Sequence, residues 1–486
     1  MKSDVAVIGS GFGGLATAIL LARLGLKVTL VEAGSHPGGC LRSYAREGVD
    51  CPVGVHYIGA AAPGEVLGDF IDALGIRSAL KLQRLGQSGI IDRYTFDDEV
   101  FELPNSIDKL ETALSKRFSH APEAVTFVVD MYKSAMASLR SSATRALPSA
   151  PITKSAADYL ADKHLPDRLV DILAVQGFLL GSNLRDCPAS FLAIVTASLL
   201  LSACELGSNG IVMADALADR AREAGVQIIL GDAVTAVDVD GQGASGVRLD
   251  SGTAITASTV VGGIHPKTLA RMLPDGALPA AYHTGLDRLE ETGGLLCVVA
   301  LVDSARHPPT DYNAFRLRGV PREALQGVYA QLRPSGKAGR TRLTVLKESA
   351  YTDWSRWHDT RTGRRGPEYR AEKARQAQIA LTEAEGAIGP IREAQIIDVW
   401  TPLSLRDWVR APQGGTYGVR HSIRDGLDFL VLARPPLEHL FLVGQNAIAP
   451  GLLGTSMGVL RTVGAIGGRE ALRGLIDKSR STGGAL

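Results

Sequence analysis

The chain has 486 residues, of which 45% are hydrophobic and 21% are charged. This length predicts two or three domains, or one large interrupted domain, and the composition excludes a largely disordered chain. Fifty-two basic and fifty-one acidic side chains give a net charge of +1. The sequence therefore has no excess of positive charge for binding nucleic acid, and no nucleic-acid partner is expected.

The cysteines indicate a reducing compartment, and we expect a cytoplasmic protein. They are odd in number, scattered and without a CxxC pair, which argues against disulfides and a zinc site. The N-terminus lacks a basic segment followed by a cleavable apolar stretch, so secretion is not expected. The longest apolar stretch, residues 191–204, is shorter than the ~20 residues that cross a bilayer. It predicts a buried helix, or one that dips into a membrane surface.

The predicted elements begin with a β-α-β unit. Residues 4–9 (DVAVIG) and 27–33 (KVTLVEA) are short apolar strands, and residues 14–25 between them have helical spacing and end in a glycine. Apolar strands of this kind beside a helix are typical of a parallel sheet that is covered on both faces.

Residues 77–203 predict a largely helical cap. Sheet patterns then return as a helix, a strand, a hairpin around residues 240–244 and a strand that ends near Gly262. Residues 290–420 mix apolar strands with a charged helix, and the chain closes with a strand, a glycine-rich loop and a helix.

Sheet elements of one kind thus occur at the start, middle and end of the chain. We expect an α/β fold in which a Rossmann-type nucleotide-binding domain is interrupted by a mixed α+β substrate-binding or cap domain. The expected nucleotide-binding domain comprises residues 1–76, 204–288 and 423–486, and the expected cap comprises residues 77–203 and 289–422.

The motif Gly9-x-Gly11-x-x-Gly14 predicts a phosphate-binding turn. Gly9 permits the tight turn, Gly11 lets the backbone approach a pyrophosphate, and Gly14 lets helix and strand pack closely. The motif follows a strand and opens a helix. Glu32, eighteen positions after Gly14, ends the second strand, where its carboxylate can accept hydrogen bonds from ribose hydroxyls. A glycine-rich surface turn is the alternative.

A second glycine pair follows Glu32 within residues 36–43 (HPGGCLRS). The pair indicates another close approach of backbone to ligand, with Arg42 as a phosphate or ring contact, although an ordinary loop has the same pattern. Together the GxGxxG turn, the terminal Glu32 and this loop resemble the FAD-binding start of the amine oxidase and phytoene desaturase superfamily.

Further motifs are similar to the retinol saturase and carotenoid isomerase branch of that superfamily. Cys40 follows the glycine pair, as in saturase-like members, where many carotene desaturases have arginine. The other matching segments are residues 54–59 (GVHYIG), 351–373 (YTDWSRWHDTRTGRRGPEYRAEK), 401–409 (TPLSLRDWV), 411–422 (APQGGTYGVRHS) and 440–468 (LFLVGQNAIAPGLLGTSMGVLRTVGAIGG).

The resemblance implies FAD as the cofactor and a glutathione reductase or amine oxidase-like fold. It places Val234 against the adenine, and the last glycine-rich loop beside the flavin ring, where Gly451, Gly454 and Gly458 let the backbone pass before the next helix starts. The positive end of that helix would stabilise negative charge on a reduced flavin. The implied cofactor residues are Gly9, Gly11, Phe12, Gly13, Gly14, Glu32, Ala33, Gly39, Cys40, Arg42, Val234, Gly444, Gln445, Gly451, Gly454 and Met457.

Candidate catalytic side chains are few. His56 and Tyr57 could protonate or orient a substrate, because imidazole is a natural proton donor near neutral pH. A hydrogen-bonded structural role is the alternative for this pair, and also for Tyr417 and His421. No Ser-His-Asp arrangement, paired-carboxylate motif or HExxH occurs, so neither hydrolase nor metal chemistry is expected.

The resemblance implies an FAD-dependent oxidoreductase that saturates, desaturates or isomerises carbon-carbon bonds of a hydrophobic polyene, carotenoid, retinoid or related lipid. The flavin would supply the hydride chemistry, and residues 191–204 would be a wall of an apolar channel, a membrane-docking face or a plain core helix. The electron partner is not indicated. Two alternatives stay open: an amine oxidase-like enzyme that acts on a C-N bond, and a non-redox prenyl-lipid escort of the GDP-dissociation-inhibitor type.

Overall fold

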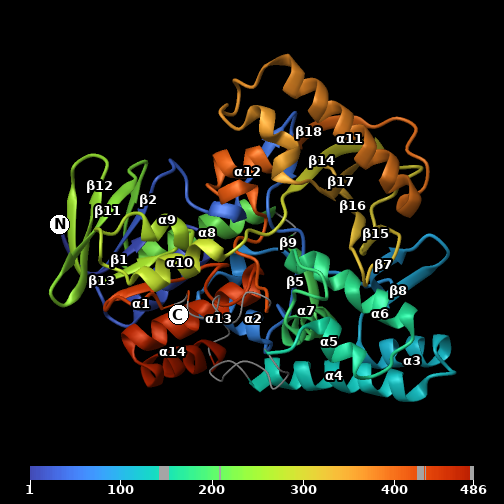
Figure 1. Ribbon diagram of the computed structural model, residues 1–486, viewed down its shortest axis with the longest axis horizontal. Coiled ribbons are helices and arrows are strands. Elements are labelled where there is room, and N and C mark those ends of the chain that lie inside the picture. Colours follow the sequence, from blue (N-terminus) through green and yellow to red (C-terminus); the bar gives the residue numbers. More distant parts are fainter. Residues whose placement is uncertain (142–152, 207–208, 424–431, 433, 482–486) are drawn as a thin grey trace.

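The computed structural model describes residues 1–141, 153–206, 209–423, 432 and 434–481, and its two large sheets lie at opposite ends of the molecule (Figure 1). The first sheet has the order β10-β2-β1-β13-β12-β11, and β19 pairs in parallel with β13. Its strands come from the start, middle and end of the chain, which confirms the α/β class. They are β1 Lys2–Ile8, β2 Val28–Glu32, β10 Gln227–Leu230, β11 Val234–Asp240, β12 Gly243–Leu249, β13 Ala254–Gly262 and β19 Leu440–Leu442.

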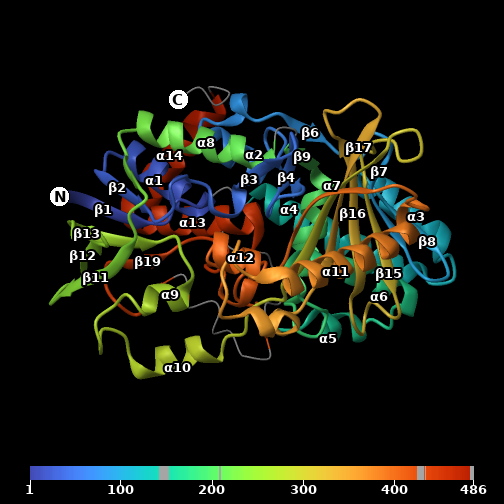
Figure 2. The ribbon, with the colours of Figure 1, turned by 90° about the horizontal axis from the view of Figure 1, so that it is seen from above.

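Helices cover the first sheet on both sides (Figure 2). The first of them, α1, packs against α8 and α13, and its residues 12–21 are all buried, which explains why it is apolar on every face. In Figure 2, α8 and α14 lie on one side of the sheet, and α9 and α10 lie on the other. The helices are α1 Phe12–Arg23, α2 Val66–Ala73, α8 Asn209–Glu223, α9 Pro266–Ala270, α10 Ala280–Arg288, α13 Gly451–Gly467 and α14 Arg469–Ser481.

The second sheet has the order β18-β14-β17-β16-β15-β7-β8 and is antiparallel except where β15 pairs with β7. Its side chains alternate between two faces, as the two-residue period of a strand requires. Leu296 and Val298 face α11, whereas Cys297 and Val299 face the interior between this sheet and the helices below it. The elements are β7 Ile90–Thr95, β8 Val100–Pro104, β14 Leu295–Asp303, β15 Asn313–Arg318, β16 Gln326–Pro334, β17 Arg340–Glu348, β18 Gln395–Trp400 and α11 Gly366–Ile388.

Residues 77–203 are less helical than the sequence predicts, because they supply β7 and β8 to the second sheet. In β8 the buried Phe101 and Leu103 alternate with the exposed Val100 and Glu102, which is the period of a strand, whereas β7 shows no such strict alternation of apolar residues. The rest of the segment forms α3 Ile107–Arg117, α4 Pro122–Ser141, α5 Ala156–Ala161, α6 Asp167–Ala174 and α7 Ala189–Leu201.

The helix α7 is a buried wall. Its residues 189–201 are buried except for the half-buried Val195, so a membrane-docking face at this place is wrong. The helix belongs to the core, and its residues Phe191 and Ser198 also line an apolar cavity, so the interpretations as core helix and as channel wall both agree with the structure. Within the described part of the chain, no helix has both the length and the apolar character that a bilayer crossing needs.

Short strands and one short helix lie between the two large sheets. A hairpin of β3 Ser43–Arg46 and β4 Val49–Pro52 follows the second glycine loop, and β5 Ile58–Gly59 pairs with β9 Ala203–Leu206, which in turn pairs with β6 Leu82–Arg84. The helix α12 Pro402–Trp408 follows β18 and begins at Pro402, where proline suits the first helical turn.

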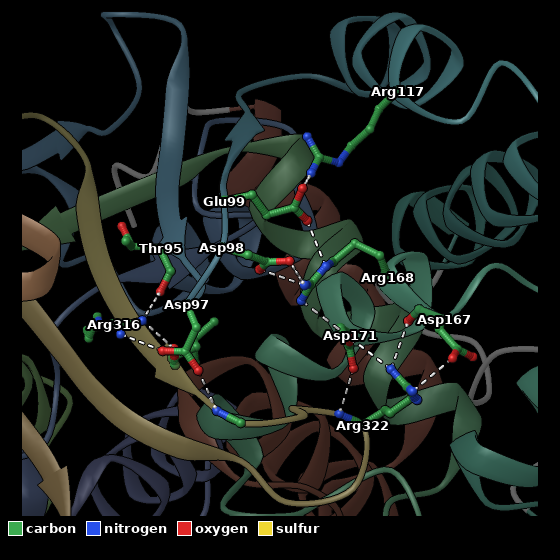
Figure 3. Close-up of polar contacts among 12 residues, drawn as sticks. Thr95, Asp97, Asp98, Glu99, Arg117, Asp167, Arg168, Asp171, Arg316 and Arg322 are labelled. Carbon is green, nitrogen blue, oxygen red and sulfur yellow. Dashed lines mark hydrogen bonds and ion pairs between the residues drawn. The ribbon is translucent and has the colours of Figure 1, made fainter.

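A group of ion pairs holds the β7–β8 turn against the cap helices and the β15–β16 loop (Figure 3). Arg168 on α6 lies 2.7 Å from both Asp98 and Glu99 in that turn, and Arg322 lies 2.9 Å from Asp171 on α6. The 3-10 helix that directly follows α6, residues 175–180, borders the central cavity. The ion pairs therefore fix the position of one cavity wall.

We expect Arg168→Ala to lower the thermal midpoint by a few degrees. The substitution removes ion pairs with three carboxylates and the guanidinium that lies 4.8 Å from the ring centre of Phe96, which together are worth about 1 to 2 kcal/mol. Arg222→Ala, which removes an exposed ion pair with Asp219, is the control and should leave the midpoint almost unchanged. Equal shifts in the two variants, measured by differential scanning fluorimetry, would contradict this role of Arg168.

Candidate functional site

The first glycine motif forms a tight turn that only glycine permits at two of its positions. Gly9 has a φ of +92°, and a Cβ there would lie 2.9 Å from the carbonyl oxygen of Gly263. A Cβ on Gly14 would lie 2.0 Å from the carbonyl oxygen of Gly9. Both glycines are therefore required by backbone packing between β1, α1 and the end of β13.

Gly11 differs from these two glycines, because its missing side chain faces open space. No atom lies within 4 Å of a Cβ built on Gly11, and the same holds for Gly444 and Gly451 near the other end of the chain. A Cβ on Gly39 would come 3.1 Å from the Cα of Gly11, so the second glycine loop lies directly beside the first. At these glycines the backbone itself borders an open space, because no side chain lies between the two.

The two glycine-rich ends of the chain are in contact. A Cβ on Gly13 would lie 2.8 Å from the backbone nitrogen of Gly444, which leaves no room for a side chain between them. Phe12, beside Gly13, is buried and packs edge-on against Phe70 of α2 at 6.0 Å between ring centres. Phe12 thus anchors the start of α1.

Glu32 ends β2 beside the first turn. One carboxylate oxygen accepts hydrogen bonds from the backbone N–H and the hydroxyl of Ser10, at 2.9 and 2.6 Å, and the other accepts from the N–H of Gly34 at 2.7 Å. A carboxylate offers roughly four acceptor positions, so about one remains for a ligand hydroxyl. Ala33, between Glu32 and Gly34, is half-buried at the same edge.

The second glycine loop is tied to the first turn by its backbone. The N–H of Gly38 donates to the carbonyl of Ser10 at 2.9 Å. Arg42 donates from Nη2 to the carbonyl of His36, while its buried Nε has no partner. Cys40 is exposed on this loop. The loop therefore offers one unused buried N–H and a thiol that is open to a ligand or solvent.

Val234 lies near the same end of the first sheet. The N–H of Gly231 donates to the carbonyl of Gly34 at 2.8 Å, and the N–H of Asp232 donates to the carbonyl of Glu32 at 3.3 Å. Val234 begins β11 two residues later and is buried. Its contact with an adenine stays a prediction.

The last glycine-rich segment differs from the sequence prediction in one respect. The helix α13 begins at Gly451, so Gly454 and Gly458 lie inside the helix and not in a loop before it. A Cβ on Gly454 would come 2.4 Å from the carbonyl oxygen of Ala449, and this close approach explains the glycine. Gln445, after Gly444, is half-buried, and Met457 lines the central cavity from α13.

The central cavity lies between the N-terminus of α13, the 3-10 helix of residues 175–180, α7 and the second sheet. Its wall is mainly apolar, and Gly451, Gly454 and Met457 at the start of α13 are part of it. The helix N-terminus at this end carries partial positive charge. The polar or aromatic lining residues are His56, Tyr57, Phe178, Phe191, Ser198, Tyr329 and Tyr417.

His56 and Tyr57 both line this cavity. Burial and the nearby positive charge of Arg342 lower the pKa of His56 to about 4, so its imidazole is neutral at physiological pH. Its buried Nδ1 has no hydrogen-bond partner within the described structure. Burial raises the pKa of Tyr57 well above its usual value, and its hydroxyl donates to Asp92 at 3.4 Å. Tyr57 thus stays protonated.

Asp92 is a buried carboxylate directly behind Tyr57. It also accepts hydrogen bonds from Tyr94 and Gln176 at 3.4 Å each and from Asn313 at 2.9 Å. Burial raises its pKa to about 6 even though these donors act in the opposite direction. Sequence reasoning missed Asp92, although a carboxylate two residues before an inward-facing aromatic on a strand was a usable signal.

The polar network continues along the inner face of the second sheet. The side-chain oxygen of Asn313 accepts from Tyr329 at 3.1 Å, from Gln331 at 3.0 Å and from Arg333 at 2.8 Å. Arg333 in turn pairs with Glu205. Hydrogen bonds from neutral donors to Asp92 and the pairing of Arg333 with Glu205 offset part of the cost of burying these charges.

Tyr417 lines the cavity, whereas His421 does not. Burial raises the pKa of Tyr417 to about 12 and lowers the pKa of His421 to about 4, so both are neutral near pH 7. His421 packs against Phe191 of α7 at 5.7 Å between ring centres. Among the residues that the structure describes, no group of His, Cys, Asp and Glu is arranged to hold a metal ion.

The glycine-lined space and the cavity together fit an extended dinucleotide with an aromatic ring at one end. Backbone approaches it at Gly11 and Gly444, Glu32 retains an acceptor position, and Arg42 retains an unpaired buried N–H. The apolar cavity adjoins the glycines of α13 and offers space for a substrate beside the ring.

Comparisons with known proteins agree with this geometry. A family model described as flavin containing amine oxidoreductase matches residues 12–461. All-trans-retinol 13,14-reductase of Macaca fascicularis is 24% identical over 98% of this chain and 87% of that protein. Hydroxyneurosporene desaturase of Cereibacter sphaeroides is 29% identical over 56% of this chain and 58% of that protein. A solved putrescine oxidase variant is 19% identical, with a TM-score of 0.65, over 96% of this chain and 99% of that one, which shows a shared fold.

Gly11→Val is expected to fold but to lose FAD. The backbone at Gly11 has a φ of −64° and a ψ of 176°, which valine adopts without strain, and the new side chain would enter open space. That space is where a pyrophosphate approaches the motif. The absorbance of the purified protein near ~450 nm reports flavin content, and circular dichroism reports folding.

Gly474→Val is the matched control, because it also places a side chain in open space, on α14. This variant should keep its flavin. Full FAD content in purified Gly11→Val would show that the first motif is only a turn.

Proposed function

Because the chain belongs to the family of flavin-containing amine oxidoreductases and is an FAD-dependent oxidoreductase, we propose that it acts on carbon-carbon bonds of a hydrophobic polyene. The reaction is saturation, desaturation or isomerisation of a carotenoid, a retinoid or a related lipid. The observation that carries the proposal is the apolar cavity that begins at the glycines of α13. Similarity to a retinol reductase along nearly the whole chain supports the same substrate class.

In this proposal the glycine-lined space holds FAD. Gly9, Gly11, Glu32 and Arg42 bind its ADP half, Val234 contacts the adenine, and the remaining predicted residues flank the rest of the cofactor. The domain that holds FAD comprises residues 1–76, 204–288 and 423–486, and the substrate domain comprises residues 77–203 and 289–422. The remaining predicted residues are Phe12, Gly13, Gly14, Ala33, Gly39, Cys40, Gly444, Gln445, Gly451, Gly454 and Met457.

The flavin, when bound, accepts or delivers the hydride. Saturation of a double bond also needs one proton, and desaturation releases one, so a residue beside the cavity has to handle it. Tyr57 is suited to this step, because it lines the cavity and its hydroxyl donates a hydrogen bond to Asp92. His56 is neutral and has its Nδ1 free, so it orients the substrate or accepts a hydrogen bond.

An amine oxidase activity is the second candidate, because several aromatic rings line the cavity. Tyr57 and Tyr329 are nearly parallel, with 8° between their ring planes and 6.0 Å between their centres. Similarity to a retinol reductase along nearly the whole chain favours the polyene over an amine. A non-redox lipid escort does not agree with membership in an oxidoreductase family.

A peripheral membrane contact belongs to the same proposal, since a polyene partitions into the bilayer and has to be taken up from it. We also propose a cytoplasmic location, because all five cysteines are free, as in a reducing compartment.

The central test is the mass of the product. We expect lipid extracts of a polyene-producing host that expresses the protein to contain a polyene that has gained or lost two hydrogens, as measured by mass spectrometry. Isomerisation would instead change the absorption spectrum at constant mass. The flavin-free Gly11→Val variant is the control. Unchanged polyenes together with oxidation of an amine by the purified protein would replace our proposal with the second candidate.

The pH dependence tests the roles of Tyr57 and Asp92. Proton delivery through Tyr57 needs protonated Asp92, so the rate of saturation should fall as the pH rises through about 6, and the rate of desaturation should rise over the same range. Asp92→Asn should remove this inflection, and Tyr57→Phe should lower the rate by 10²-fold or more, on the order of general acid catalysis.

His56→Gln is the comparison for this profile. Since the pKa of His56 is about 4, its loss should leave the inflection near pH 6 in place even if the rate falls. An inflection that persists in Asp92→Asn and disappears in His56→Gln would reverse the two roles.

A further inference from the structure

One large aromatic side chain lies open to solvent. Trp408, the last residue of α12, is 63% exposed, and no other Phe, Tyr or Trp of the described residues is exposed. The remaining tryptophans, Trp354, Trp357 and Trp400, are buried. An indole ring is typical of a place where a protein meets a partner that is apolar on one side and wet on the other.

The loop of residues 359–364 is bound to the last turn of α12, beside this tryptophan. The backbone N–H and the hydroxyl of Thr362 donate to Asp407 at 2.7 and 2.9 Å. Asp407 directly precedes Trp408, so the loop and the indole belong to one surface of the molecule. In both views α12 lies between the two large sheets (Figure 1, Figure 2).

This surface carries positive charge that the described residues do not neutralise. Arg361 and Arg364 are exposed in the loop, and Arg410 is exposed two residues after the tryptophan. None of the three guanidiniums forms an ion pair within the described part of the chain. Asp407 is already paired with two other arginines, which leaves Asp359 as the acid of the loop. The surface therefore suits an anionic partner.

A tightly packed turn joins this surface to the central cavity. Arg410 has a φ of +56°, which is uncommon for a side chain other than glycine. A Cβ on Gly414 would lie 2.3 Å from the carbonyl oxygen of Pro402, so the turn packs against the start of α12. The same segment then reaches Tyr417 in the cavity wall. A partner bound at Trp408 is thus held close to the cavity.

We propose that Trp408 and the exposed arginines beside it form a surface that docks on an anionic lipid bilayer. The indole enters the headgroup region, and the guanidiniums bind lipid phosphates and anionic headgroups. This inference deepens the proposed function and rests on it, because it assigns the peripheral membrane contact to named residues and to a class of lipid. The residues of this docking surface are Arg361, Arg364, Trp408 and Arg410.

The first test is co-sedimentation of the FAD-loaded protein with lipid vesicles. Vesicles of phosphatidylcholine with about 30% phosphatidylglycerol are compared with vesicles of phosphatidylcholine alone. We expect binding to the anionic vesicles and little binding to the neutral ones. Added salt should weaken the binding, since it screens exposed charges.

Arg364→Glu should weaken binding to the anionic vesicles by about tenfold or more. One arginine near such a surface is worth about fivefold in affinity, and the new carboxylate is repelled. Arg392→Glu is the matched control, because Arg392 is also exposed but follows the far end of α11, whose 23 residues span roughly 35 Å. The control should bind almost as the wild type does. Flavin absorbance confirms that both variants are folded.

The second test follows the tryptophan itself. Lipids with brominated acyl chains quench the fluorescence of an indole that enters the bilayer. Because the other three tryptophans are buried, quenching of the wild-type protein should come from Trp408. Trp408→Phe should still sediment with the anionic vesicles but should lose this quenching.

These assays contain no polyene, so they fail independently of the proposed function. Absence of vesicle binding, equal binding to neutral and anionic vesicles, or equal losses in Arg364→Glu and Arg392→Glu would overturn the docking surface. Undiminished quenching in Trp408→Phe would show that another segment enters the bilayer. In each case a polyene product with two hydrogens gained or lost would leave the proposed function in place. Vesicle binding that depends on Arg364 and Trp408, without any change in a polyene, would retain the docking surface and remove the proposed function.

Discussion

The close approach of backbone segments at glycine is the constraint on which the rest of the structure depends. Gly9 and Gly14 let β1, α1 and the end of β13 meet, and Gly13 lets the start of α1 touch Gly444. The pairing of β19 with β13 brings Gly444 to this place from the far end of the chain. A side chain at any of these contacts would push the elements apart. It would thereby distort the space that Gly11 leaves for a dinucleotide. The cofactor site is thus assembled only when the whole chain has folded.

The second sheet has one apolar face, which packs against α11, and one partly polar face, which lies toward the interior. Alternation along β16 points Val328 and Ala330 toward α11, and Tyr329 and Gln331 toward the interior. The inner row continues into Asn313 and Asp92 on the neighbouring strands. A polar layer therefore lies directly behind an apolar cavity, so hydrogen-bonding groups are close to a substrate without being exposed to water.

Much of the fold and of the candidate cofactor site could be predicted from the sequence, and the predictions that failed did so for physical reasons. The β-α-β start, the position of Glu32 at the end of β2 and the return of the chain at β19 follow from local periodicity and glycine spacing. The pair β7 and β8 was predicted as part of a helical cap, since strands that join a distant sheet have no local signal of their partner. Gly454 was placed before a helix that in fact begins at Gly451, because helix starts depend on capping geometry. Asp92 was missed because only tertiary packing brings it behind Tyr57.

Burial also decides which groups around the cavity can carry charge. The low pKa of His56 and the raised pKa of Tyr57 and Tyr417 make all three side chains neutral near pH 7. Asp92, behind Tyr57, has a pKa of about 6 and therefore changes charge close to physiological pH. An uncharged wall suits a hydrocarbon chain, whereas a proton that accompanies a hydride has to come from a titrating group. In the proposed function Asp92 meets both requirements, because it lies one layer behind the wall and is in contact with Tyr57.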